Sequence, residues 1–250
     1  MAERKYISRI ALKSGERLEP YLRELPAVQR LLSGKPLSFS SDITFFVGEN
    51  GTGKSTLLEA IAVACGFNAE GGSRSFDFST SRTHSNLYES LVVSRQAYPK
   101  DGFFLRAESF YNAATYIDRL DEELPGLTRS YGGVSLHRQS HGESFFSLVQ
   151  NRFGGRGLYL LDEPEAALSP MRQMAMLVQI DELKKRQSQF IIATHSPILM
   201  ACPDAQVLLF SEEGIREVSY RETEHYQLSR RFLEDPERML DILLNRKSPV

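Results

Sequence analysis

The stretch "GENGTGKST", from Gly48 to Thr56, decides the fold of this chain. It lies between an apolar run at 42–47 and a helix-like stretch at 54–65, and it matches the pattern G-x-x-x-x-G-K-[ST] in the context that this pattern requires. Its glycines let backbone N–H groups turn inward without side chains in the way, and the following helix adds the positive end of its dipole. The stretch therefore predicts a phosphate-binding loop.

Every residue of this loop is a candidate nucleotide-binding residue, and two of them have further predicted roles. Lys54 can reach the β- and γ-phosphates and act in catalysis there, and the hydroxyl of Ser55 can ligate Mg²⁺. A glycine-rich turn with an incidental lysine is the alternative interpretation, which the complete pattern in the right context disfavours. The candidate set is Gly48, Glu49, Asn50, Gly51, Thr52, Gly53, Lys54, Ser55 and Thr56.

Short apolar runs alternate with helix-like stretches along the rest of the chain. Runs of this kind, bounded by polar residues or glycine, are typical of strands buried on both faces of a parallel sheet. The pattern predicts an α/β fold, a P-loop NTPase with a mostly parallel sheet flanked by helices. The expected strands are 42–47, 102–107, 158–162, 189–194 and 206–210, and the expected helices among them are 54–65 and 170–187.

Four regions depart from this alternation. We expect a small inserted helical lobe at about 109–150, a loop at 66–90, a hairpin at 212–218 and a helical C-terminal tail at about 222–250. Residues 1–250 as a whole are expected to form a single domain.

Composition excludes several classes of protein. The chain has 250 residues, of which 41% are hydrophobic, and its net charge of −2 gives no electrostatic reason for bulk nucleic-acid binding. Cys65 and Cys202 have no metal-site context and are expected to be small core residues in a reducing compartment. Because no apolar segment is long enough for a signal peptide or a membrane span, we expect a cytoplasmic protein without direct membrane insertion.

A pair of carboxylates follows the apolar run of "LYLLDEP", residues 158–164. Asp162, at the end of a predicted strand beside a phosphate loop, is the expected carboxylate at Mg²⁺. Glu163 is a candidate catalytic base, since a second carboxylate can orient and polarise an attacking water. The alternative is an acidic strand end that caps the next helix, which the intervening proline disfavours.

A histidine follows another predicted strand, in "ATHSP", residues 193–197. His195 is expected at the sheet edge where ligands bind in open α/β folds, and there it can hydrogen-bond the γ-phosphate and the attacking water. We therefore count His195 as a catalytic candidate. A lone histidine is more often structural, and we interpret His84, His137 and His225 in that way.

The order of motifs, "GENGTGKST", "SHGES", "LYLLDEP" and "ATHSP", resembles the nucleotide-binding domain of the ATP-binding-cassette (ABC) superfamily. The resemblance extends over about residues 40 to 210. It implies an ABC-type ATPase core, ATP and Mg²⁺ as ligands, and ATP hydrolysis.

The resemblance also gives a meaning to "SHGES", which stands where the family has its Leu-Ser-Gly-Gly-Gln signature. Ser140 and Gly142 hold the positions that, in the family, contact the γ-phosphate of ATP bound to the other subunit. Gln139, His141 and Glu143 depart from the family residues. The resemblance thus implies an ATP-dependent homodimer, head to tail, with each nucleotide between two copies.

Other family positions are less regular here. Glu108 stands where the family has the glutamine that acts near Mg²⁺, which makes it a candidate metal ligand, although an ion pair of a buried Glu108 with Arg106 is an equal alternative. Gln96 is a poorer candidate because it precedes the strand. Tyr21 is a candidate for stacking on adenine, and Ser169 replaces the aspartate of the family's subunit-contacting loop.

Two functions from different classes fit these motifs. The first is a stand-alone ATPase of the chromosome-maintenance, repair and defence group, which "GENGTGKSTLLEAIA" resembles and whose partner would be an effector protein or DNA. The second is the ATP-binding subunit of a membrane transporter, which the departures at the signature disfavour. A small-molecule kinase is a third, weak interpretation, because it explains the phosphate loop but neither "SHGES" nor His195.

Overall fold

The computed structural model describes residues 5–13, 18–74, 85–108, 110–123, 126, 133, 135–138 and 140–246. Its centre is a six-stranded sheet with the strand order β5-β6-β7-β3-β8-β9, in which β9 alone runs antiparallel to its neighbour. The five runs predicted as strands are all present, and the predicted hairpin is formed by the last two strands. The strands are β3 (Ile43–Gly48), β5 (Asp101–Arg106), β6 (Gly157–Asp162), β7 (Gln189–Ala193), β8 (Gln206–Ser211) and β9 (Gly214–Val218).

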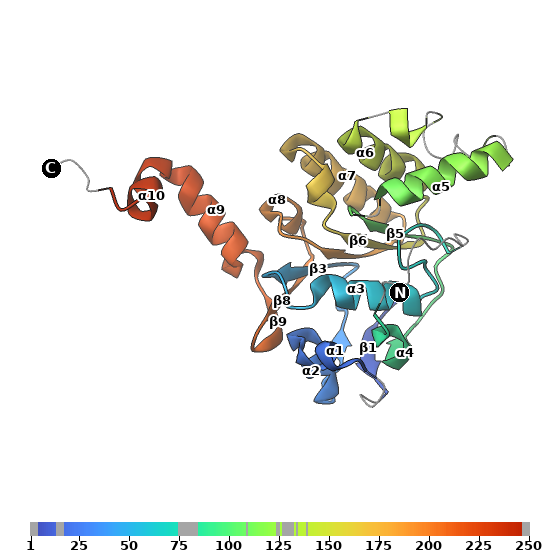
Figure 1. Cartoon of the computed structure of the whole chain (residues 1–250), viewed down its shortest axis with the longest axis horizontal. Helices are drawn as coiled ribbons and strands as arrows, with labels where there is room; N and C mark the ends of the chain where they lie inside the picture. The colour runs from blue at the N-terminus through green and yellow to red at the C-terminus, as the bar shows by residue number, and fades with distance from the viewer. Residues whose placement is uncertain are drawn as a thin grey trace.

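Helices cover both faces of this sheet, and the side chains of each strand alternate between them (Figure 1). Phe45 of β3 packs with α5 (Phe110–Glu123), α6 (His141–Arg152) and α7 (Pro170–Lys185), whereas its neighbour Phe46 packs with α3 (Lys54–Ala64). Both phenylalanines are fully buried. Burial on both faces explains why these strands read as continuous apolar runs, and it confirms the predicted α/β fold.

A second, smaller sheet lies beyond α3 and was not predicted. It has three antiparallel strands in the order β2-β1-β4, and its apolar side chains join those of α3 in one core. The loop expected at 66–90 ends in a short helix, and its residues 75–84 lie outside the described part of the chain. The elements of this region are β1 (Arg9–Leu12), α1 (Pro20–Glu24), α2 (Pro26–Leu32), β2 (Leu37–Ser38), α4 (Leu87–Ser90) and β4 (Leu91–Ser94).

The C-terminal tail is helical and extends away from the rest of the molecule (Figure 1). After the short helix α8 (Pro197–Met200) and the β8–β9 hairpin, the chain forms α9 (Glu224–Glu234) and α10 (Pro236–Leu243). Apolar side chains of both tail helices are exposed, among them Leu233 and Leu243. Across the described residues, no helix has the length and apolar character that crossing a membrane requires.

Candidate functional site

The carboxyl ends of four parallel strands bring the predicted site residues to one edge of the sheet. In the strand register, Asp162 at the end of β6 lies opposite both Arg106 of β5 and Ala193 of β7. The phosphate loop follows β3, which is the other neighbour of β7. Ligands of open α/β sheets bind at this edge.

The loop after β3 has a backbone that its glycines make possible. Gly51 and Gly53 have φ values of 83° and 92°, in the left-handed region that favours glycine. At Gly48 a glycine is needed because of close packing: a Cβ there would lie 2.1 Å from the carbonyl oxygen of Phe210 in β8. The spacing of glycines that identifies the loop in the sequence is therefore needed by its geometry.

Lys54 is the first residue of α3, and its side chain folds back over the loop. Its Nζ donates hydrogen bonds of 2.7 Å to the carbonyl oxygens of Gly48 and Glu49, and the residue is 4% exposed. Burial lowers the pKa of Lys54, and nearby carboxylates, chiefly Glu163 and Asp162, oppose this effect. The ammonium group thus lies among the loop carbonyls, where a phosphate would meet it.

Ser55 and Asp162 form the candidate metal pair. The Ser55 hydroxyl donates a 2.8 Å hydrogen bond to Oδ1 of Asp162, while Oδ2 lies 3.5 Å from Nε of Arg106. Burial raises the pKa of Asp162 to about 6, although Arg106 and Ser55 oppose the shift. A hydroxyl beside a carboxylate is a donor set that suits Mg²⁺, so these two residues fit the cation that the fold implies.

Arg106 belongs to this charged cluster, and the sequence did not reveal its main partner. Its Nη1 lies 2.7 Å from Oε2 of Glu59 in α3, which makes Glu59 its nearest carboxylate. The guanidinium therefore joins β5, α3 and the Asp162 carboxylate. The positive charge of Arg106 limits the repulsion between the buried carboxylates of Glu59 and Asp162.

Glu163 follows β6 in a left-handed conformation, with φ and ψ both 50°. This conformation is uncommon for a residue other than glycine, and a 2.9 Å hydrogen bond from its N–H to the carbonyl oxygen of Ala193 holds it. Its side chain is 42% exposed. A depression beside the loop is lined by Leu25, Asn50, Gly51, Gly53, Lys54, Ser55, Thr56 and Glu163. The predicted base and the phosphate loop therefore face the same space.

His195 lies beside Glu163, with 3.7 Å between its Nε2 and Oε1 of Glu163. The turn that carries it is held by Glu165, a residue that the sequence did not single out. The Glu165 carboxylate accepts hydrogen bonds of 2.7 Å from Oγ1 of Thr194 and 2.5 Å from the backbone N–H of His195. Because Glu165 is two residues after Glu163, one carboxylate joins the turn of the predicted base to the turn of the histidine.

Replacement of Glu165 with Ala is expected to destabilise the protein as well as to slow any reaction at the site. It leaves the buried Thr194 hydroxyl and the His195 N–H without their acceptor, which costs roughly 1–3 kcal/mol for each unsatisfied group. Chemical denaturation should show a fall of about 2 kcal/mol or more in the free energy of unfolding. Glu213→Ala, in the exposed hairpin turn, is the control and should change it by less than about 0.5 kcal/mol. Equal values for the two variants would contradict the role given to Glu165.

The signature-like stretch begins α6. Ser140 is the residue before the helix, and its N–H and hydroxyl both donate to the Glu143 carboxylate, at 3.1 and 2.7 Å. Gly142 has no room for a side chain, since a Cβ would lie 2.7 Å from the carbonyl oxygen of Ala167 and 2.8 Å from Nη1 of Arg172. The glycine is therefore needed for packing within the chain, whatever else it contacts. Neither Ser140 nor Gly142 lines the depression at the phosphate loop.

Several other predicted residues do not line the depression at the phosphate loop. Glu108 is 87% exposed, not buried, and its carboxylate is 3.8 Å from Arg106. Gln96 pairs with Lys5 at the edge of the small sheet. Tyr21 is exposed on α1 and does not line the depression, where Leu25 lies instead.

Four further residues were given a structural interpretation or noted for departing from the family, and the structure describes three of them. Ser169 caps α7 by accepting a hydrogen bond from the N–H of Arg172. His137 contacts Thr115 of α5, and His84 lies outside the described residues. His225 differs from both, because it lies against the site with its Nε2 3.0 Å from Nδ1 of His195.

Comparisons with known proteins agree with this architecture. A family model described as AAA domain matches residues 30–119, and a model described as "AAA domain, putative AbiEii toxin, Type IV TA system" matches residues 134–201. The first match includes the phosphate loop, and the second includes "SHGES", "LYLLDEP" and "ATHSP". No curated protein matches the chain significantly.

Comparison with solved structures gives matches at low sequence identity. One described as "An inward-facing conformation of a putative metal-chelate type ABC transporter" is 16% identical, with a TM-score of 0.51 and coverage of 90% of this chain and 88% of that chain. The SMC head domain from Thermotoga maritima is 17% identical, with a TM-score of 0.42 and coverage of 85% and 99%. The chain therefore has the fold of an ABC-type P-loop NTPase, and AAA domain models match two separate parts of it.

Proposed function

We propose that this chain binds ATP with Mg²⁺, forms a head-to-tail homodimer around the nucleotide, and hydrolyses ATP to drive a conformational switch. The observation that carries this proposal is the convergence of Lys54, Ser55, Asp162, Glu163 and His195 at one edge of the sheet. A generic nucleotide-binding site needs the loop and the metal pair, whereas a base candidate beside a histidine suits hydrolysis. We further propose that the process served is DNA maintenance or defence.

The residues divide the reaction among them as follows. The loop N–H groups and Lys54 bind the phosphates. Ser55 and Asp162 would hold Mg²⁺, which would neutralise charge on the phosphate oxygens. Glu163 orients a water and accepts its proton as the water oxygen bonds to the γ-phosphorus. The bond from that phosphorus to the bridging oxygen breaks, which gives ADP and inorganic phosphate. His195, beside Glu163, can hydrogen-bond the γ-phosphate and the attacking water.

The second copy enters through Ser140 and Gly142. In this chain both lie at the first turn of α6 and outside the depression of their own phosphate loop, which is consistent with their serving the site of a partner copy. The N-terminal end of α6 carries partial positive charge, which favours a bound phosphate group.

A mixture of two inactive variants tests the head-to-tail arrangement. Lys54→Ala removes the loop lysine and Ser140→Arg blocks the signature turn, so each variant alone is expected to hydrolyse no ATP. In a head-to-tail dimer, one site of each mixed pair combines an intact loop with an intact signature turn. An equal mixture should therefore regain about a quarter of the wild-type turnover per chain, since half of the random pairs are mixed.

The same mixture has a clear contrary outcome. No recovery on mixing, while the Ser140→Arg protein still binds ATP with normal affinity, would contradict a shared site. As a control, the Ser140→Arg protein is mixed with buffer in place of the Lys54→Ala protein. If this sample hydrolyses ATP as fast as the mixture of variants, the Ser140→Arg protein was active by itself. Phosphate release with and without Mg²⁺ gives the basal activity against which both variants are compared.

An ATP-binding subunit of a membrane transporter is the second candidate. It shares the fold, as the solved structure with a TM-score of 0.51 illustrates. Two features favour the first candidate: Glu108 in place of a glutamine, and the residues of "SHGES" that differ from the family signature. ATP turnover stimulated by DNA supports the stand-alone ATPase, and co-purification with a membrane-spanning protein supports the transporter subunit.

A further inference from the structure

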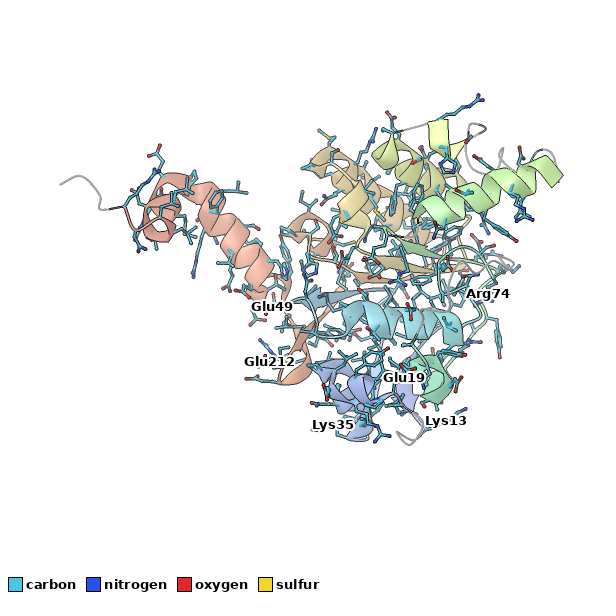
Figure 2. The ribbon with its side chains drawn as sticks, in the orientation of Figure 1. Lys13, Glu19, Lys35, Glu49, Arg74 and Glu212 are labelled. Atoms are coloured by element: carbon cyan, nitrogen blue, oxygen red, sulfur yellow. The ribbon has the colours of Figure 1, made fainter. Side chains whose placement is uncertain are left out.

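His225 brings the C-terminal tail into contact with the candidate site. It is the second residue of α9, and Thr223, which caps this helix, is fully buried. The imidazole of His225 lies on that of His195, with ring centroids 5.1 Å apart and 3.0 Å between His225 Nε2 and His195 Nδ1. Figure 2 labels Glu49 of the phosphate loop at the side of the molecule from which α9 departs.

A hydrogen bond between two neutral imidazoles contains one proton, which must belong to one of the facing nitrogens. Burial lowers the pKa of His195, and Lys54 lowers it further while Glu163 raises it. Burial also lowers the pKa of His225, with His195 and Lys54 acting in the same direction and Glu224 and Glu165 opposing them. Both rings are therefore neutral at pH 7.5, and the pair has two possible proton arrangements.

The surroundings of His195 choose between these two arrangements. Its second nitrogen, Nε2, is buried, has no hydrogen-bond partner among the described residues, and lies 3.7 Å from Oε1 of Glu163. A carboxylate only accepts hydrogen bonds, so an N–H is favoured at this nitrogen and a lone pair is disfavoured. His195 then has no proton on Nδ1, and the shared proton belongs to Nε2 of His225.

We infer that His225 is a positioning residue for the hydrolysis: it donates its Nε2–H to His195 Nδ1 and so keeps the other N–H of His195 directed at Glu163. This inference rests on the proposed function, because it concerns the same reaction. It also means that the first turn of α9 takes part in setting the geometry of the nucleotide site. Displacement of that turn would free the His195 ring to rotate and to change its tautomer.

Nitrogen NMR of the nucleotide-free protein tests the pair without any reaction. In ¹⁵N-labelled protein at pH 7.5, with His195→Gln and His225→Gln used for assignment, His195 should carry its proton on Nε2. Its Nδ1 signal should have the shift of a hydrogen-bonded acceptor, and His225→Phe should move that signal to the free-acceptor value. A proton on Nδ1 of His195, or a Nδ1 signal that His225→Phe leaves in place, would overturn the inference.

Steady-state kinetics then separates a positioning role from a structural one. His225→Phe keeps a ring of similar size, and it should lower kcat about tenfold with an unchanged KM for ATP, as loss of a partner that orients a histidine does at metal sites. His225→Gln should restore much of the rate, because its amide nitrogen can donate to Nδ1. Tyr226→Phe, in the same turn and packed on Tyr220, is the matched control and should keep the wild-type kcat.

The outcomes distinguish this inference from the proposed function. If kcat falls equally in His225→Phe and His225→Gln, and both variants unfold at lower temperatures, the positioning role is overturned and a structural role remains. A wild-type protein that hydrolyses no ATP would overturn the proposed function, and with it any role of His225 in hydrolysis. In that case the NMR signals still decide whether the histidine pair exists.

Discussion

Replacement of Glu163 with Gln is expected to reduce kcat for ATP hydrolysis by about 100-fold or more, because an amide cannot accept the proton of the attacking water. The two side chains have the same shape, and the bond from the backbone N–H of residue 163 to Ala193 is unaffected. ATP binding should therefore persist. Since bound ATP is then consumed slowly, the variant should accumulate as a dimer in size-exclusion chromatography with ATP and Mg²⁺.

A matched control and a contrary result complete this test. Glu212→Gln makes the same chemical change at an exposed position of the β8–β9 turn and should keep the wild-type kcat. Near-normal turnover of the Glu163→Gln protein would exclude Glu163 as the base. An exclusively monomeric variant in saturating ATP would contradict the proposed closure around the nucleotide.

Replacement of Lys54 with Ala should have the other large effect, a loss of ATP affinity of about 100-fold or more. The ammonium group is buried among the loop carbonyls, and Lys54 is the one cationic residue among those that line the depression, so its loss removes a charge-assisted contact in a poorly solvated place. Isothermal titration calorimetry with a non-hydrolysable ATP analogue measures the effect directly.

The controls for Lys54 address charge and folding separately. Lys35→Ala removes an exposed lysine that follows α2 and is labelled in Figure 2, and it should leave ATP affinity unchanged. Lys54→Met keeps the apolar stem and should fold at least as well as the alanine variant. Retention of wild-type affinity by a folded Lys54→Met protein would refute the assignment of the phosphate loop.

The central sheet could be predicted because the burial of each strand is visible in the sequence of that strand alone. Phe45 and Phe46 point to opposite faces, yet both are buried, so β3 and its neighbours read as uninterrupted apolar runs. The small sheet gave no such pattern. β1 has four residues with mixed burial and β2 has two, which is too little sequence for a periodicity to appear.

Some residues of the candidate site could likewise be predicted from the sequence, and others could not. The loop from Gly48 to Thr56 and the pair Asp162–Glu163 depend on neighbours in sequence, and their positions could be predicted. Glu165 and His225 could not, because each acts through a contact with the turn of His195 about 30 residues away. No motif in the sequence singles out Glu165, and a histidine at the start of a charged tail has no distinguishing pattern.

The double hydrogen bond of Glu165 has a consequence for how two copies would control the reaction. One carboxylate joins the turn after β6 to the turn after β7, so the backbone segments that carry Glu163 and His195 are held together. In the proposed dimer, the approach of a second copy would then change the rate by shifting the terminal phosphate relative to these two turns, and not by moving the turns apart.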